Sequence, residues 1–88
     1  MRIKTIRVTS LFERHYRKLP KRVKEEVRKR ELAFRENPFD STLKTHKLHG
    51  KEKDAYALWI NYSYRIKFIF LDEDSVLFLD IGTHDIYS

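Results

Sequence analysis

The sequence has no cysteine among its 88 residues, and only two glycines and two prolines. Without cysteine, neither a disulfide framework nor a thiolate metal site can form, so packing has to stabilise the fold. No stretch approaches the ~20 consecutive apolar residues of a membrane span, and the N-terminus lacks an apolar segment long enough for a signal peptide. We therefore expect one soluble, cytoplasmic domain that covers residues 1–88 and does not associate with a membrane.

Charged residues are plentiful but unevenly distributed. Residues 1–35 hold 13 Lys and Arg against four Glu, a balance of +9, and the rest hold six against nine, a balance of −3, which together give the net charge of +6. A positive surface attracts polyanions, of which nucleic acids and anionic membranes are the usual examples. The same charges could equally form a solvated helix face that keeps the protein soluble.

Hydrophobic periodicity divides the chain into strands and helices. Alternation and β-branched residues predict strands, and apolar residues at the helical period predict helices. The expected order is a strand over 3–9, helices over 10–19 and 20–36, and strands over 42–48, 54–60, 64–70 and 75–81.

Local signals predict where these elements begin and end. Ser10 is expected to cap the first helix, with Glu13 as its capping-box partner. Pro20 suits the first turn of the second helix. At the C-terminal end, Gly82 is expected to stop the last strand at a turn, just before a cluster of titratable residues in "IGTHDIY".

Short links between the later strands imply antiparallel neighbours. The fold class is therefore α+β: an N-terminal strand, a two-helix hairpin, and then a curled antiparallel sheet of about four strands with the helices on one face. Alternation in "YRIKFIF" directs Ile66 and Phe68 towards a core, and Arg65 and Lys67 towards the other face. We expect that other face to be open and within reach of the C-terminal cluster.

Side chains suited to RNA cleavage are present. Such a reaction needs a base for the 2′-hydroxyl, positive charge for the phosphate and an acid for the leaving 5′-oxygen, and each acid or base typically contributes ~10² to 10⁴ in rate. The candidates are Arg65, His84, Tyr87 and His46. Each also has a simpler interpretation: Arg65 could pair with Asp80 or Glu52, His84 could be solvated, and Tyr87 could cover the edge of the core.

The segment "KTHKLHGKEK" is basic and contains two histidines. It supplies candidate RNA contacts, together with one residue of the fourth strand: Lys44, Lys47, Lys51, Lys53 and Lys67. If the segment is a strand, His46 and Lys47 point to opposite faces. The His-x-x-His spacing of His46 and His49 suggests zinc, but no companion ligand motif accompanies it, so we expect neither a metal nor a cofactor.

Over nearly its full length, the chain resembles the RelE/ParE superfamily of toxins from type II toxin–antitoxin pairs. The resemblance is carried by the two-helix start, "ENPFDSTLKTHKLHG", "YRIKFIF" and "LFLDIGTHDIY", with "LKTHKL.G" similar to the histidine-using branch typified by YafQ. It implies ribosome-dependent endonucleolytic cleavage of mRNA in the ribosomal A site. It also implies a toxin monomer held in a hetero-oligomer by a small acidic antitoxin.

The resemblance also implies residue roles. Arg65 matches the phosphate-stabilising arginine, Tyr87 the C-terminal aromatic, and His46 and His84 the histidines of the YafQ-like branch. Trp59 stands where that branch has another histidine. Two alternatives remain open: a non-enzymatic poison of DNA gyrase, as in the ParE branch, and an inactive homologue that acts only as a binding module with its antitoxin.

Overall fold

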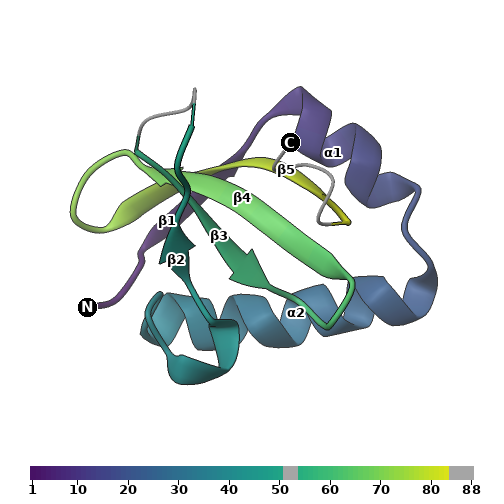
Figure 1. Cartoon of the computed structure of the whole chain (residues 1–88), viewed down its shortest axis with the longest axis horizontal. Coiled ribbons are helices and arrows are strands. Elements are labelled where there is room, and N and C mark those ends of the chain that lie inside the picture. Colours follow the sequence, from purple (N-terminus) through teal and green to yellow (C-terminus); the bar gives the residue numbers. More distant parts are fainter. Residues whose placement is uncertain (51–53, 84–88) are drawn as a thin grey trace.

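A computed structural model describes residues 1–50 and 54–83 of the chain. Its elements follow the expected order of strand, helix, helix and strands (Figure 1). They are β1 (Thr5–Val8), α1 (Ser10–Arg17), α2 (Lys21–Glu36), the short 3₁₀ helix η1 (Ser41–Leu43), β2 (His46–Lys47), β3 (Ala55–Trp59), β4 (Tyr64–Phe70) and β5 (Ser75–Thr83).

The strands form one mixed sheet in the order β1-β5-β4-β3-β2. The strands from β2 to β5 pair antiparallel with their neighbours, as the short links predict. β1 lies at the edge and pairs parallel with β5, from Thr5 opposite Ser75 to Val8 opposite Phe78. The α+β class is confirmed, and β1 adds a parallel edge that local sequence signals do not indicate.

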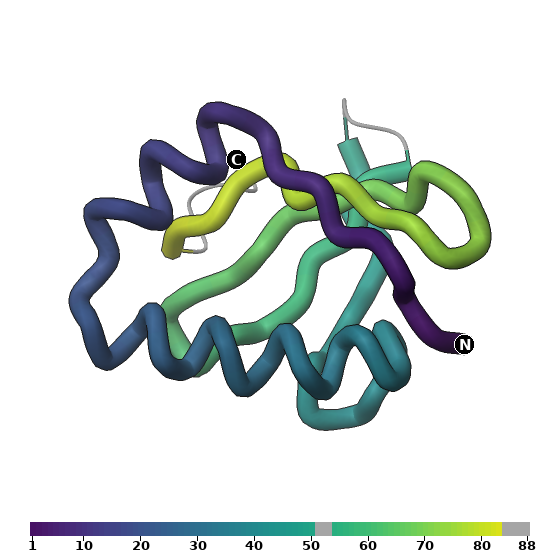
Figure 2. Tube along the Cα trace, turned by 180° about the vertical axis from the view of Figure 1, so that it is seen from behind, coloured from purple at the N-terminus to yellow at the C-terminus, as the bar shows by residue number. Residues whose placement is uncertain are grey.

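Both helices contact the same face of the sheet through aromatic residues. Phe34 of α2 lies 5.0 Å from Phe68 and 5.6 Å from Phe78, measured between ring centroids, and Phe12 of α1 lies 5.4 Å from Phe78. Figure 2 shows α1 beside β5 and α2 running across the strands. The expectation of helices on one face is confirmed. No helix in the described part of the chain is long and apolar enough to cross a membrane.

The cap of α1 differs from the sequence-based expectation by one residue. Thr9, not Ser10, is the N-cap: its Oγ1 accepts a hydrogen bond from the Phe12 amide at 3.0 Å and donates one to the Leu79 carbonyl at 2.7 Å. Glu13 does not complete a capping box and instead lies 3.5 Å from Arg17. The second bond to β5 is a tertiary contact, which explains why Thr9 is the cap although Ser10 also has a suitable side chain.

The strand expected over residues 42–48 is mostly absent, because a tight turn takes its place. The Asp40 carboxylate accepts hydrogen bonds from the Thr42 hydroxyl at 2.6 Å and the Thr42 amide at 2.9 Å. These two bonds, the hydroxyl one first, hold the pKa of Asp40 below its ordinary value of 3.8. Lys44 follows with φ of 49°, in the left-handed region, so only His46 and Lys47 pair with β3.

The last strand is longer than expected. β5 continues through Gly82 to Thr83, and Gly82 lies opposite Arg65 in the β4–β5 pairing. Gly82 is therefore a strand residue and not the turn residue that a glycine at this position suggests. Cross-strand pairing with β4 decides this, and glycine inside a strand is typical of places where another group lies close to the backbone.

Candidate functional site

The sheet face opposite the helices, here called the outer face, carries two rows of side chains. Residues that pair directly in an antiparallel sheet point to the same side, so the pairings define the rows. The first row runs through Trp59, Arg65 and Gly82, and the second through His46, Ala57, Lys67 and Asp80. The outer face therefore collects predicted site residues from β2 and β4, namely His46, Arg65 and Lys67.

Arg65 is on the predicted face but is not exposed there. Only 7% of its surface is accessible, which makes it the one buried charged residue among those described. Its Nη1 donates hydrogen bonds to the Asn61 carbonyl at 2.7 Å and the Tyr64 carbonyl at 3.1 Å. Its guanidinium carbon lies 3.8 Å from the centroid of the Trp59 ring. Backbone carbonyls and an indole thus hold this cation, so the expectation of an exposed arginine is wrong.

Asp80 does not pair with Arg65. In the described part of the chain its carboxylate Oδ1 lies 2.6 Å from Nδ1 of His15 on α1 and accepts a hydrogen bond from the Ile81 amide at 2.8 Å. Glu52, the other acidic candidate for Arg65, lies outside the described residues. Asp80 therefore connects α1 to the outer face and leaves Arg65 to its carbonyl and indole contacts.

His46 shares the outer face with Arg65, whereas Lys47 points to the other side, as strand alternation predicts. Nδ1 of His46 lies 2.9 Å from the Lys44 carbonyl oxygen. A carbonyl only accepts hydrogen bonds, so Nδ1 carries a proton, and Nε2 is the nitrogen that can exchange one in the neutral ring. Lys47 has an ion-pair contact of 4.0 Å with Asp54.

Lys67 lines a shallow hollow on the outer face, beside the start of α1. The hollow has a volume of about 340 Å³, and its other walls are Thr9, Leu11, Leu79 and Asp80. It lies next to the row that contains Arg65, because Lys67 is two residues further along β4. Lys67 is the single lysine of β4 and lies on the same face as Arg65.

Four of the predicted site residues lie outside the described part of the chain: Lys51, Lys53, His84 and Tyr87. Their roles stay predictions. Within residues 1–50 and 54–83, no group of three or more His, Asp or Glu side chains is arranged to hold a metal ion.

Trp59 and His15 contact the site, but sequence reasoning does not select them. Besides Arg65, Trp59 contacts Lys44, whose Nζ lies 5.1 Å from the ring centroid, and Tyr62, whose ring centroid lies 6.3 Å away. Trp59 is the single tryptophan of the chain. Strand alternation was the available signal. Leu58 is buried, so its neighbour Trp59 points to the other face of the sheet, where its β4 partner Arg65 also lies.

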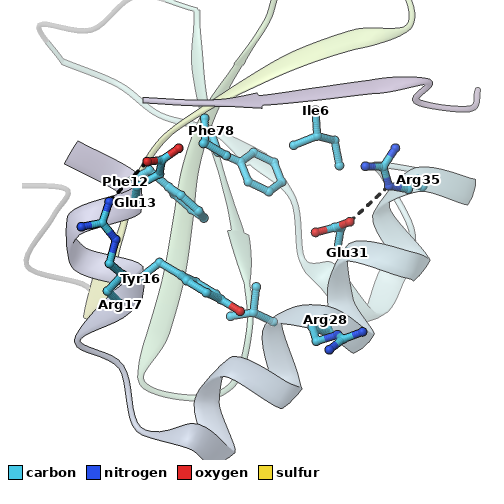
Figure 3. Close-up of a pocket in the computed structure, with 11 residues that line it drawn as sticks. Ile6, Phe12, Glu13, Tyr16, Arg17, Arg28, Glu31, Arg35 and Phe78 are labelled. Atoms are coloured by element: carbon cyan, nitrogen blue, oxygen red, sulfur yellow. Dashed lines mark hydrogen bonds and ion pairs between the residues drawn. The ribbon is translucent and has the colours of Figure 1, made fainter. Parts of the chain in front are cut away.

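A second hollow lies between α1, α2 and β1, on the helix side of the molecule (Figure 3). It has a volume of about 320 Å³, and Ile6, Phe12 and Phe78 contribute to its apolar lining. Charged residues at the hollow form two ion pairs, Glu13 with Arg17 at 3.5 Å and Glu31 with Arg35 at 3.2 Å. The other polar side chains that line it are Arg28 and Tyr16.

Neither a protein-family model nor a curated protein sequence matches the chain. Solved structures do match it. A YoeB/ParE toxin from Agrobacterium tumefaciens has a TM-score of 0.79 at 14% identity, with 92% of this chain and 99% of that chain covered. YafQ from E. coli has a TM-score of 0.77 at 16% identity, covering 94% and 96%. RelE in the archaeal RelE–RelB complex from Pyrococcus horikoshii has a TM-score of 0.74 at 15% identity, also covering 94% and 96%.

These structures match the chain almost end to end, and the match includes a YafQ protein, the type of the branch that the sequence resembles. Sequence identities of 14–16% show a shared fold and do not transfer an activity. The chain has the fold of the YoeB/ParE, YafQ and RelE toxins.

Proposed function

We propose that this protein is the toxin of a type II toxin–antitoxin pair and that it cleaves mRNA in the ribosomal A site without a metal ion. The observation that supports this most strongly is the environment of Arg65. A buried guanidinium on the outer face, held by two backbone carbonyls and an indole, is a fixed positive charge. Fixed charge aimed at a developing negative charge is the largest single contribution in many enzymes.

In the proposed reaction the 2′-oxygen attacks the adjacent phosphorus, the 5′-oxygen leaves, and a cyclic phosphate remains. Arg65 stabilises the charge on the pentacoordinate phosphate. We assign the first proton transfer to His46, on the same face, through Nε2, because Nδ1 is turned to the Lys44 carbonyl. We assign the second proton transfer to His84 or Tyr87, and we assign phosphate contacts to Lys44, Lys47, Lys51, Lys53 and Lys67.

The test is primer extension on translated messages after induction of the protein. We expect new 5′ ends in the parent and a loss of cleavage of about 10²- to 10³-fold in Arg65→Ala, the range seen when a charge-stabilising donor is removed. The matched control is Arg22→Ala, which removes an exposed arginine on α2. Intact transcripts in the parent would contradict the proposal, and inhibition of supercoiling with intact mRNA would favour the gyrase alternative.

The proposed partner is an antitoxin with an acidic, amphipathic segment. Solved structures with this fold include toxin–antitoxin complexes, among them the RelE–RelB, DinJ–YafQ and YoeB–YefM pairs. In this chain, the hollow between α1, α2 and β1 has apolar walls and three arginines, Arg17, Arg28 and Arg35, against two glutamates, Glu13 and Glu31. A helix with one apolar and one acidic face matches both properties.

Salt dependence tests this partner. If charge complementarity contributes to binding, the affinity of the purified pair falls between low and moderate salt, because exposed charges are screened. Arg28→Gln is expected to weaken binding and to flatten the salt dependence. An affinity that does not change with salt would contradict the electrostatic part of the proposal.

A further inference from the structure

Trp59 lies between two cations in the first row of the outer face. It pairs directly with Arg65 in the β3–β4 ladder. On the β2 side, Lys44 lies in the left-handed turn two residues before His46, where the β2–β3 pairing begins. The contacts agree with this order: the guanidinium carbon of Arg65 is 3.8 Å from the ring centroid, and Nζ of Lys44 is 5.1 Å from it. Both distances are within the range of a cation–π interaction.

Two cations at one aromatic ring repel each other, so an arrangement that keeps both has to compensate for the repulsion. The indole does so in part, because the negative face of its ring attracts each cation. For Arg65 the carbonyls of Asn61 and Tyr64 add to this attraction. Both bonds use Nη1, and the Nε–Nη2 edge of a guanidinium has the geometry that suits two oxygens of a phosphate.

The backbone also holds Lys44 in place. Its φ of 49° lies in the left-handed region, at the end of η1, and its carbonyl accepts the hydrogen bond from Nδ1 of His46. Lys44 is therefore directed towards Trp59 by a turn that Asp40 caps. Trp59, Arg65 and His46 lie in adjacent rows of one sheet face, and Lys44 lies in the turn just before β2.

We propose that Trp59 is a positioning residue that holds Arg65 and Lys44 as one paired site for the phosphodiester groups of a single RNA strand. This inference rests on the proposed function, because it assigns the RNA contacts of the same face. It explains the presence of tryptophan, where the resemblance to the YafQ-like branch would place a histidine. Here the indole acts through the cations and does not transfer a proton.

The inference can be tested without any cleavage. The purified protein is titrated with a 2′-O-methyl RNA oligonucleotide, which lacks the attacking hydroxyl. Binding is followed by the anisotropy of a label on the RNA and by the emission of Trp59, which reports on this site alone because it is the single tryptophan. We expect a saturable change in emission that follows the anisotropy with the same midpoint.

Variants separate positioning from a purely structural role. Trp59→Leu is expected to weaken oligonucleotide binding about threefold to thirtyfold, the range of a cation–π contact, whereas Trp59→Phe keeps most of the affinity. Trp59→Leu combined with Arg65→Lys should lose less affinity than the sum of the two single losses, because the ring acts in part through that cation. The matched control is Tyr62→Ser, which removes a ring that contacts Trp59 but is 85% exposed.

Lys44→Gln provides a check that does not depend on the stability of the Trp59 variants. Loss of one phosphate contact to a single strand lowers the slope of log affinity against log salt by about 0.7. Each of four results would overturn the inference. They are an unchanged salt slope in Lys44→Gln, additive losses in the double variant, affinity equal to that of the parent in folded Trp59→Leu, and no binding of the oligonucleotide by the parent.

The outcomes also separate this inference from the proposed function. Oligonucleotide binding that depends on Trp59, together with intact mRNA after induction, contradicts the cleavage activity but not the paired site. Cleavage of mRNA by the parent, together with oligonucleotide binding that does not depend on Trp59, contradicts the paired site but not the activity.

Discussion

The two faces of the sheet differ in what holds their side chains. On the helix side, apolar and aromatic residues contact one another, and Phe34, Phe68 and Val76 have no accessible surface. On the outer face, Arg65 is held by carbonyls and an indole, and Asp80 by a histidine. The first arrangement needs only shape and apolar area, whereas the second needs particular atoms at particular distances.

This difference has a consequence for stability and function. A core built of aromatic rings is sensitive to truncation of its side chains, because each ring that is removed leaves a cavity. The polar contacts of the outer face each contribute less to the free energy of unfolding, because folding only exchanges hydrogen bonds to water for hydrogen bonds within the protein. We therefore expect changes on the helix side to alter stability first, and changes on the outer face to alter binding and activity first.

The largest effect is expected for Phe68→Ala on the helix side. Phe68 has no accessible surface, and its ring centroid lies 5.0 Å from Phe34 and 5.4 Å from Phe70. Removing the ring should lower the free energy of unfolding by about 3–5 kcal/mol, measured by urea denaturation. Tyr62→Ala, at an exposed ring, should change it by less than about 0.5 kcal/mol. Similar losses for the two variants would contradict the difference between the faces.

A smaller effect is expected for the contact between His15 and Asp80. The two groups are 2.6 Å apart, and their side chains are 38% and 13% exposed, so water screens the interaction in part. A double-mutant cycle with His15→Gln and Asp80→Asn should give a coupling energy of about 1 kcal/mol. The exposed pair of Glu13 and Arg17, at 3.5 Å, should give less than about 0.5 kcal/mol. Equal coupling in both pairs would show that α1 is not held to the outer face in this way.

The smallest effect is expected at Asp40, at the border of the outer face. The Thr42 hydrogen bonds lower the pKa of Asp40 below 3.8 in the folded state, so this carboxylate stabilises the fold above that value and loses its contribution as the pH falls through the lowered pKa. Urea midpoints measured from about pH 5 to about pH 2 should therefore fall less steeply for Asp40→Asn than for the parent. An identical pH dependence in the two proteins would mean that the turn before Lys44 does not depend on this carboxylate.

The pattern of β4 was predictable because alternation is a local property of an extended chain. Ile66 and Phe68 lie in the core, and Arg65 and Lys67 lie on the other face, as the sequence indicates. The order of elements and the α+β class followed from the same reasoning. The resemblance to the RelE/ParE superfamily also agrees with the solved structures that share the fold.

The surroundings of Arg65 were not predictable in the same way. Its burial depends on Trp59, which comes from another strand and reaches it only through the β3–β4 register. Asp80, one of the two acidic residues considered as a partner of Arg65, is bound by His15, which is 65 positions away in the chain. Gly82 looks like a turn residue locally but pairs in the sheet. In each case a partner distant in sequence determines the outcome.

The sequence by itself determined which residues alternate, where helices form, that no disulfide can contribute, and that the positive charge lies in the first half of the chain. These properties depend on neighbours within a few positions or on composition. Only the tertiary structure decided that β1 pairs parallel with β5, that Thr9 caps α1, and that Trp59 lies between Lys44 and Arg65. These contacts require strand register and helix packing, which are set by the burial of the whole apolar core and not by any short segment.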